Sequence, residues 1–215
     1  MLNRKAFTLS ELLVALAIVG AIAAMAIPAV VEDMNRKLLA NQLKNISLTV
    51  QTLAADQLVA NKVQSLEYTD FKNPTSLLTN SNFAIADMCA TRANCVASKY
   101  SRISGEAYSF PYYTMRKLKN GVTIAYALAA TGNLSGSTDQ GYGIFYVDLN
   151  GVDYPNILGR DVFAFRISKK GRIFDGTTNN AQSDTNLKNW CIKAAGGYTT
   201  TCYTLVERNN WKITY

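Results

Sequence analysis

The feature that most constrains this chain is an uncharged apolar run from Leu12 to Val31, close to the N-terminus. An α-helix needs about 20 such residues to cross the hydrocarbon core of a bilayer, and this run is that long. A short basic leader with Arg4 and Lys5 precedes it, and the sequence from Glu32 onward has the polarity of a soluble domain. The sequence therefore predicts a domain carried on a membrane-embedded helix.

Three interpretations of this N-terminus compete. A secretory signal peptide has an apolar core of about 7–15 residues, so this run is too long for one. An uncleaved anchor helix fits the length but leaves Glu11 unexplained, because a carboxylate at the centre of a membrane helix costs about 2.5–3.5 kcal/mol. Glu11 lies near the end of the run, where a plain interfacial carboxylate costs less. In the third interpretation, cleavage between Ala6 and Phe7 creates a new ammonium group, and a neighbouring subunit brings its own ammonium to Glu11.

The segment from Ala6 to Leu13, AFTLSELL, resembles the class III signal of type IV prepilins and type II secretion pseudopilins. The resemblance implies that a prepilin peptidase cleaves between Ala6 and Phe7 and methylates the Phe7 nitrogen. It also implies that Glu11 accepts the ammonium of a neighbouring subunit during assembly. Two positions depart from the common pattern, since Ala6 replaces the usual glycine and Ser10 replaces an apolar residue.

The resemblance implies an α+β, pilin-like fold, in which a long N-terminal membrane-spanning helix packs through its C-terminal half on an antiparallel β-sheet. An amphipathic stripe with helical spacing continues beyond the apolar run and supports this expectation. It consists of Leu39, Leu43, Ile46, Val50 and Leu53. The expected divisions are a leader (1–6), a transmembrane and filament-core half of the helix (7–31), an amphipathic half (32–59) and an extracytoplasmic globular domain (60–215).

Pro28 lies where many pilin stalks carry a helix-breaking proline, so an assembly role is assigned to it together with Glu11. A proline or glycine is where such a helix kinks or melts locally, which makes Pro28 and Gly20 the expected places for a bend. Prolines are also tolerated in ordinary membrane helices, and the sequence leaves both interpretations open. In the globular part, alternating or apolar runs predict strands over 121–128, 142–149 and 162–167, followed by a turn into 172–174.

The chain contains no histidine, which excludes Ser-His-Asp and Cys-His nucleophilic sites and histidine-ligated zinc. No pair of carboxylates stands out as catalytic, and an enzyme is not expected. The net charge is +7, but the lysines and arginines are dispersed. Dispersed charge indicates a generally basic surface, so nucleic acid is not expected as a partner.

Four cysteines lie in the globular part as two local pairs, Cys89 with Cys95 and Cys191 with Cys202. Neither pair has the CxxC spacing of redox or zinc motifs. An even number of cysteines in a domain outside the cytoplasm indicates disulfides. Three pairings are possible and the local one is preferred, with free buried thiols as the alternative.

One polar loop has the residue types of a metal site. Asp148, Asn150 and Asp153 loosely resemble the start of a calcium loop, because hard cations bind oxygen ligands of this kind. However, Gly159 stands where an EF-hand needs its closing glutamate. Asn-Gly and Pro-Asn also form turns by themselves, so a turn without a ligand is the preferred interpretation and a calcium site the alternative.

The sequence thus predicts a non-enzymatic structural subunit of a type IV pilus-like filament. A pseudopilin of a type II secretion system is the alternative in the same class, and a membrane-tethered binding domain with an uncleaved anchor is the alternative in a different class. The expected partners are other pilin-like subunits, the prepilin peptidase, the inner-membrane assembly machinery and, before assembly, lipid. The resemblance implies a single-pass bacterial inner-membrane protein with its C-terminal domain outside, destined for a surface pilus or a periplasmic pseudopilus.

Overall fold

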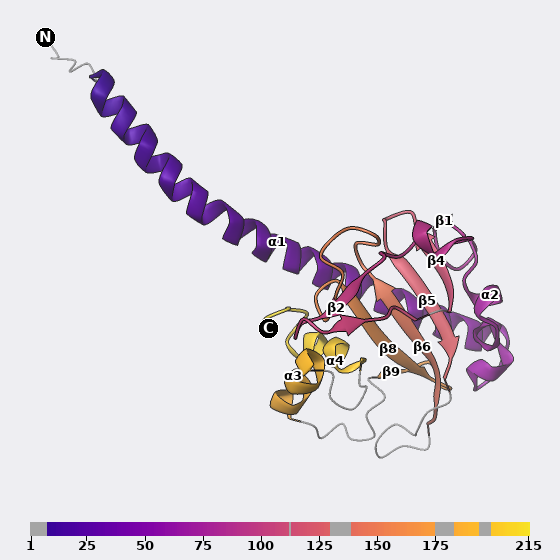
Figure 1. Cartoon of the computed structure of the whole chain (residues 1–215). Helices are drawn as coiled ribbons and strands as arrows, with labels where there is room; N and C mark the ends of the chain where they lie inside the picture. The colour runs from indigo at the N-terminus through magenta and orange to yellow at the C-terminus, as the bar shows by residue number, and fades with distance from the viewer. Residues whose placement is uncertain (1–7, 112, 130–138, 175–182, 194–198) are drawn as a thin grey trace, which may run out of the picture.

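One helix, α1, extends from Leu9 to Ala60. The computed structural model describes residues 8–111, 113–129, 139–174, 183–193 and 199–215. Thr8 begins the helix as its N-cap, in a capping box with Glu11, and the C-cap is Asn61. The N-terminal half of α1 projects away from the rest of the molecule as a gently curved rod, whereas the other half lies against the globular part (Figure 1). The two halves therefore have different surroundings.

The C-terminal half of α1 forms one side of the main hydrophobic core. Its buried apolar residues recur every three or four positions, as expected for one face of a helix. They are Ala40, Leu43, Ile46, Val50 and Ala54. Leu39 and Leu53 are partly buried and pack against the same cluster. The predicted amphipathic stripe is thus confirmed, and the helix is part of the domain rather than a detachable stalk.

Short helical turns connect α1 to the sheet: the 3₁₀ helices η1 (Leu66–Tyr68) and η2 (Asp70–Lys72), and the helix α2 (Pro74–Leu77). Gln57 of α1 holds this connection through two hydrogen bonds. Its side-chain Nε2 donates to Asp70 Oδ2 at 3.0 Å, and its Oε1 accepts from the backbone N–H of Asp70 at 3.0 Å. The chain is therefore attached to α1 again directly after it leaves the helix.

A nine-stranded sheet in the described part of the chain packs on α1 (Figure 1). Its order is β1-β4-β5-β6-β8-β7-β2-β3, and β9 pairs with β8. The strands are β1 (Ile85–Asp87), β2 (Tyr100–Arg102), β3 (Ala107–Tyr108), β4 (Thr114–Leu118), β5 (Thr123–Leu128), β6 (Gly141–Asp148), β7 (Ile157–Leu158), β8 (Val162–Ser168) and β9 (Ile173–Phe174). A further 3₁₀ helix, η3 (Arg92–Asn94), lies between β1 and β2.

The expected α+β, pilin-like architecture is confirmed, and its sheet is mixed rather than antiparallel throughout. The long strands β4, β5, β6 and β8 pair antiparallel with their neighbours, but β7 pairs parallel with both β2 and β8. This difference arises because β7 is only two residues long and lies within the loop that joins β6 to β8. The loop places β7 beside β8, and the other edge of β7 pairs with β2.

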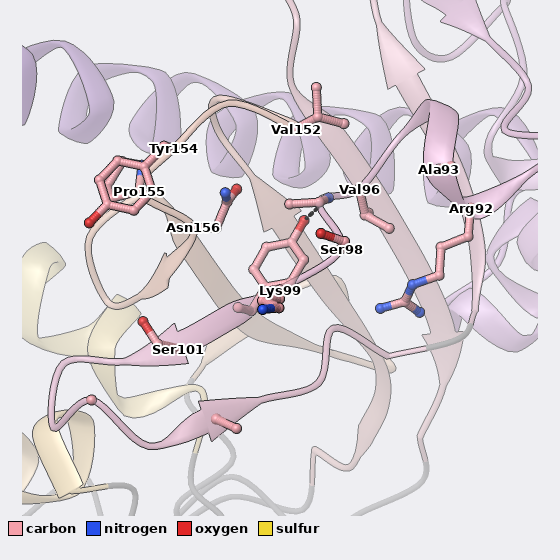
Figure 2. A pocket seen from close by; sticks show the side chains of 14 residues that line it. Arg92, Ala93, Val96, Ser98, Lys99, Ser101, Val152, Tyr154, Pro155 and Asn156 are labelled. Atoms are coloured by element: carbon pink, nitrogen blue, oxygen red, sulfur yellow. Dashed lines mark hydrogen bonds between the residues drawn. The ribbon is translucent and has the colours of Figure 1, made fainter.

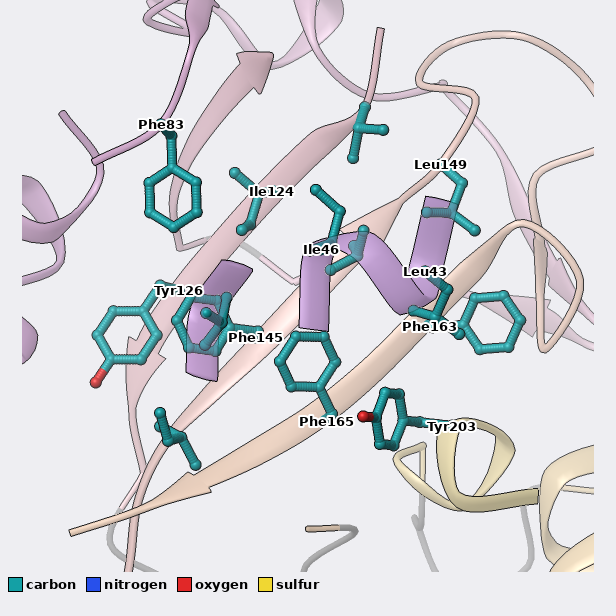
Figure 3. Packing of buried hydrophobic residues seen from close by; sticks show 14 of the residues in the cluster. Leu43, Ile46, Phe83, Ile124, Tyr126, Phe145, Leu149, Phe163, Phe165 and Tyr203 are labelled. Atoms are coloured by element: carbon teal, nitrogen blue, oxygen red, sulfur yellow. The ribbon is translucent and has the colours of Figure 1, made fainter. Parts of the chain in front are cut away.

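Successive residues of the central strands point to opposite faces of the sheet, and both faces are buried. One face carries Ile124 and Tyr126 of β5 and Phe145 of β6, which pack with Leu43 and Ile46 of α1 (Figure 3). The other face forms a second cluster, which includes the following residues: Tyr100, Phe110, Ala125, Ile144, Tyr146 and Val162. The central strands β5, β6 and β8 therefore lie between α1 and the edge segment of the same sheet that contains β2 and β3.

Two short helices near the C-terminus, α3 (Asp184–Lys193) and α4 (Thr201–Arg208), complete the fold. Tyr203 of α4 contacts the core, with its ring centroid 5.0 Å from that of Phe165 in β8. Trp211 packs edge-on against Tyr203 at 5.8 Å. The C-terminal segment is thus held against the same core that α1 covers.

Candidate functional site

The N-terminus of α1 holds its only first-turn carboxylate in a defined position. Both the backbone N–H and the hydroxyl of Thr8 donate to Glu11 Oε2, at 2.8 Å and 2.7 Å, and the Glu11 N–H donates back to Thr8 Oγ1 at 3.3 Å. This arrangement satisfies N-terminal N–H groups that a helix otherwise leaves unpaired. Both donors contact Oε2, so among the described residues Oε1 of Glu11 accepts no hydrogen bond.

The apolar surface that follows Glu11 is not covered by the chain's own domain. The most hydrophobic 18-residue window of α1 has none of its residues buried. By its length and composition alone, α1 could cross a membrane. Side chains such as Leu13, Leu16 and Ile22 are each at least 60 % exposed. An apolar surface of this extent needs lipid or other protein around it.

Pro28 lies inside this surface, and the helix continues through it without interruption. The helix also continues through Gly20, around which an added Cβ would have no neighbour within 4 Å. The helix therefore does not melt locally at these positions, and a bend that lets the helices pack in a filament stays a prediction. The assembly role of Pro28 stays a prediction.

The polar loop between β6 and β8 contains two buried carboxylates, Asp148 and Asp161, whose side chains are both 0 % exposed. Asp148 ends β6, and Asp161 directly precedes β8. The backbone N–H of Leu149 donates to the carbonyl of Asp161 at 2.8 Å, which places the two acidic residues on neighbouring strands. Asp161 accepts from the backbone N–H groups of Asn156 and Ile157 at 2.7 Å and 2.6 Å. Asp161 therefore holds the far side of the loop in place.

Asp148 is surrounded differently, because its Oδ2 accepts from the hydroxyl of Tyr100 in β2. The pKa of Asp148 is raised to about 8, mainly by burial. The negative charge of the nearby Asp161 also raises this pKa, whereas the hydrogen bond from Tyr100 lowers it. Burial also raises the pKa of Asp161. Two carboxyl groups thus share a water-poor region of the loop.

The three expected calcium ligands differ in their burial. Asp148 is buried, Asn150 is half-buried, and Asp153 is exposed. The Asn150 side-chain amide donates to the carbonyl of Asp153 at 2.7 Å, so Asp153 contributes its backbone rather than its carboxylate to the loop. Three side-chain oxygens of this loop are buried without a hydrogen-bond partner: Asp148 Oδ1, Asn150 Oδ1 and Asn156 Oδ1. Asn156 and Asp161 belong to the same polar segment of the sequence, but sequence reasoning did not assign them as ligands.

Both pairs of cysteines form local disulfides, Cys89–Cys95 and Cys191–Cys202, which are the preferred pairings. The second links α3 to α4. Asp87, Cys89 and Cys95 are the one group in the described residues whose potential metal-ligating atoms all lie within 4.8 Å of one another. Because both sulfurs of that group are in a disulfide, they are not available as thiolate ligands.

A surface hollow of about 980 Å³ lies beside the loop between β6 and β8. Residues of 92–101 and 105–107 line one side, and Val152, Tyr154, Pro155 and Asn156 line the other (Figure 2). Tyr154 is 88 % exposed at the rim. The position of this rim depends on the same loop that Asp148 and Asp161 hold.

In the comparison with protein families, the model of the prokaryotic N-terminal methylation motif matches residues 1–27. The chain carries a prepilin-type signal, the signal of type IV pilins and pseudopilins. Searches among curated proteins and among solved structures gave no match. The architecture agrees with the signal, since a long apolar N-terminal helix followed by a β-sheet domain is pilin-like.

The prepilin-type signal includes Ala6 and Phe7, which lie outside the described residues. Their roles in cleavage and methylation stay predictions, as does the assembly role of Glu11. The signal and the exposed apolar helix are consistent with an envelope-associated protein anchored in the inner membrane, and they point to a structural subunit rather than an enzyme.

Sequence reasoning also missed Thr8 as a partner of Glu11. The available signal was the pattern Thr-x-x-Glu just before an apolar run, which is the sequence form of a capping box. In a prepilin-type signal the carboxylate is easily interpreted through assembly alone. The structure adds a second role for Glu11 within its own helix.

Proposed function

We propose that this chain is a structural subunit of a type IV pilus-like filament. A prepilin peptidase cleaves between Ala6 and Phe7 and methylates the Phe7 nitrogen, and the mature subunits assemble side by side through α1. The observation that carries this proposal is that the helix with the methylation motif has an apolar surface which its own domain leaves uncovered.

The apolar half of α1 has two suitable environments. Before assembly, lipid covers it. During assembly, helices of neighbouring subunits replace the lipid, so these side chains never meet water. Helix packing in an apolar environment gains little from the hydrophobic effect, because lipid tails are equally apolar. Specific polar contacts therefore determine the axial register of one helix relative to the next.

Glu11 is the group suited to this selection. A carboxylate in an apolar environment needs a partner, and Thr8 supplies two neutral donors that both contact Oε2. Oε1 is left to accept a charged donor, and the ammonium of Phe7 from a neighbouring subunit has the right charge. A charge-assisted hydrogen bond is stronger than a neutral one, and it sets the axial register between subunits.

Processing by the peptidase and assembly through α1 imply particular partners and a particular location. The partners are the peptidase, the inner-membrane assembly machinery and other pilin-like subunits. The precursor spans the inner membrane once, with the domain of residues 60–215 outside the cytoplasm. A pseudopilin of a type II secretion system has the same N-terminal mechanism and differs in where the filament ends.

Mass spectrometry of the native N-terminus tests the processing step, with membrane and sheared surface fractions measured separately. We expect a terminus at N-methylated Phe7 in both fractions. A processed protein confined to the membrane fraction would favour a pseudopilin over a surface pilus. An intact Met1 terminus in cells that contain an active prepilin peptidase would refute the proposal and favour an uncleaved, membrane-tethered domain.

A set of substitutions tests the role of Glu11. Glu11→Gln keeps an acceptor for Thr8 but removes the charge, whereas Glu11→Ala removes both. We expect both variants to be cleaved and inserted but to be incorporated about ten- to a hundredfold less, since a hydrogen bond to a charged group contributes about 1.5–3 kcal/mol. Glu32→Ala, which removes an exposed carboxylate of the same helix bonded to Arg36, is the matched control and should assemble normally. Normal assembly of Glu11→Gln would show that the charge has no such role.

A further inference from the structure

We propose that the loop between β6 and β8 binds a calcium ion through side-chain oxygens of Asp148, Asn150, Asn156 and Asp161. This set shares Asp148 and Asn150 with the ligands expected from sequence spacing, but it replaces the exposed Asp153 with two buried residues from the far end of the loop. The contacts within the loop support this site independently of filament assembly.

The first observation is the unbalanced charge of the loop. Asp148 and Asp161 are both fully buried, and Asp161 directly precedes Val162, the residue of β8 that pairs with Asp148 of β6. Among the described residues, no salt bridge joins either carboxylate to a lysine or arginine. Buried carboxylates are normally paired with a cation or bound to a metal, because removing an ionised group from water is costly.

The second observation is the set of buried oxygens without a donor. Asp148 Oδ1, Asn150 Oδ1 and Asn156 Oδ1 have no hydrogen-bond partner, although each atom is shielded from solvent. All three can only accept, so hydrogen bonds with one another cannot satisfy them when Asp148 is ionised. Leaving such an acceptor unsatisfied costs about 1–3 kcal/mol. A bound cation would satisfy all three.

The third observation is that the surrounding contacts hold these side chains in place. Tyr100 donates to the other oxygen of Asp148, and the Asn150 amide nitrogen donates to the Asp153 carbonyl. The backbone of Asn156 is held by Asp161. Each oxygen of the Asp161 carboxylate accepts one backbone N–H, which fixes the orientation of this carboxylate. Hydrogen bonds from neighbouring groups to the ligands of a metal keep those ligands oriented toward it.

The donor set favours calcium over magnesium and zinc. It contains only oxygens, whereas zinc sites are built mainly from cysteine and histidine, and this chain has no histidine. Two carboxylates with two amide oxygens in an irregular loop suit the variable geometry of calcium, while magnesium requires near-octahedral ligands and keeps several waters. A calcium ion here would hold the rim of the neighbouring hollow, including the exposed Tyr154 (Figure 2). A supply of calcium outside the cytoplasm follows from the proposed function, but binding itself does not depend on it.

The test uses the full chain, purified in detergent and freed of metal with a chelator that is then removed. We expect 10 mM calcium chloride to raise the thermal midpoint by about 3–10 °C, which is the stabilisation given by a site with a Kd of about 0.1–1 mM. Magnesium chloride at the same concentration should raise it less. Titration calorimetry with calcium should give one site per chain.

Variants identify the ligands. Asp148→Asn, which is isosteric, and Asn150→Ala should both lose the calcium-dependent shift, and the second variant serves if the first does not fold. Asp153→Asn, which changes only an exposed carboxylate, should keep it. The proposal is overturned if the folded wild-type chain shows neither a shift nor binding heat at 10 mM calcium, because Asp148 is then neutralised by a proton. It is equally overturned if Asp153→Asn loses the shift while Asp148→Asn keeps it. Neither result bears on filament assembly, which is measured separately through Glu11.

Discussion

We expect Gly143→Ala to destabilise the domain by displacing the buried ring of Tyr126. An added Cβ at Gly143 would lie 2.4 Å from both Cε2 and the hydroxyl oxygen of Tyr126, and 2.7 Å from Cζ. The tyrosine cannot easily move aside. It is fully buried, its hydroxyl donates to the carbonyl of Phe71 at 3.0 Å, and its ring lies 4.6 Å from that of Phe145.

The magnitude follows from two costs and one gain. Forcing an extra methyl group into a packed core costs about 1–3 kcal/mol, and losing the buried Tyr126 hydrogen bond costs a similar amount. Replacing glycine with alanine returns up to about 1 kcal/mol, because it restricts the unfolded chain. The free energy of unfolding should therefore fall by about 2–4 kcal/mol. For a domain of this size, that corresponds to a decrease of about 5–15 °C in the thermal midpoint.

Thermal unfolding of the full chain in detergent, followed by circular dichroism, measures this decrease. A double-variant cycle isolates the clash, because Tyr126→Leu removes the atoms that the new methyl group meets. In that background Gly143→Ala should cost less than about 1 kcal/mol. A midpoint for Gly143→Ala within about 2 °C of wild type, or an equal loss in both backgrounds, would refute the reasoning.

Three further expectations concern the same domain, and thermal unfolding measures each. Replacing Cys191 and Cys202 together with serine should cost about 2–3 kcal/mol, because the disulfide closes a loop with a sequence separation of 11, whereas an unchanged midpoint in the presence and absence of reductant would contradict its presence. Leu43→Ala should cost about 2–5 kcal/mol through the cavity left between α1 and the sheet, while the exposed Leu48→Ala should cost much less. In chelator, the contribution of Asp148 to stability should decrease by at most about 1.4 kcal/mol per unit as the pH rises from about 4 toward 8, because the folded pKa of Asp148 is raised to about 8. Asp148→Asn should reduce this slope and leave the part due to Asp161, whose pKa burial also raises, whereas an identical slope in that variant would assign the whole of it to other groups.

Much of the architecture could be predicted because the strongest patterns are local. The apolar run and the stripe through Leu43 and Val50 predicted α1, and the runs over 121–128, 142–149 and 162–167 correspond to β5, β6 and β8 within one or two residues. These central strands are long and buried on both faces, so their sequences carry enough apolar and β-branched residues to stand out.

The elements that sequence reasoning missed depend on distant contacts. Helix α4 contains Thr201, Cys202 and Thr204, which have modest helix propensity, and it is helical because its buried face packs on β8. Strands β2, β3 and β7 are two or three residues long, which is too short to show a period. Their pairing exists only after the loop between β6 and β8 has formed.

The residues of the candidate sites also differ in whether a local sequence pattern or a distant contact reveals them. Glu11 was evident because a charge next to an apolar run is a local anomaly. Asp161 was not, because its importance comes from burial beside Asp148 across two strands, and spacing along the chain does not report that. Asp153 fitted the spacing of a metal loop, yet its side chain faces solvent.

The shared core of α1 and the sheet has a mechanical consequence. A tensile force applied along α1 would reach the domain through residues Leu43, Ile46 and Val50 of that helix, which lie deep between the helix and the strands. Such a force loads that interface in shear, so these contacts must slip together and cannot peel apart one at a time. The subunit would therefore transmit tension from stalk to domain as a rigid unit, and pulling it apart would require the hydrophobic core itself to rupture.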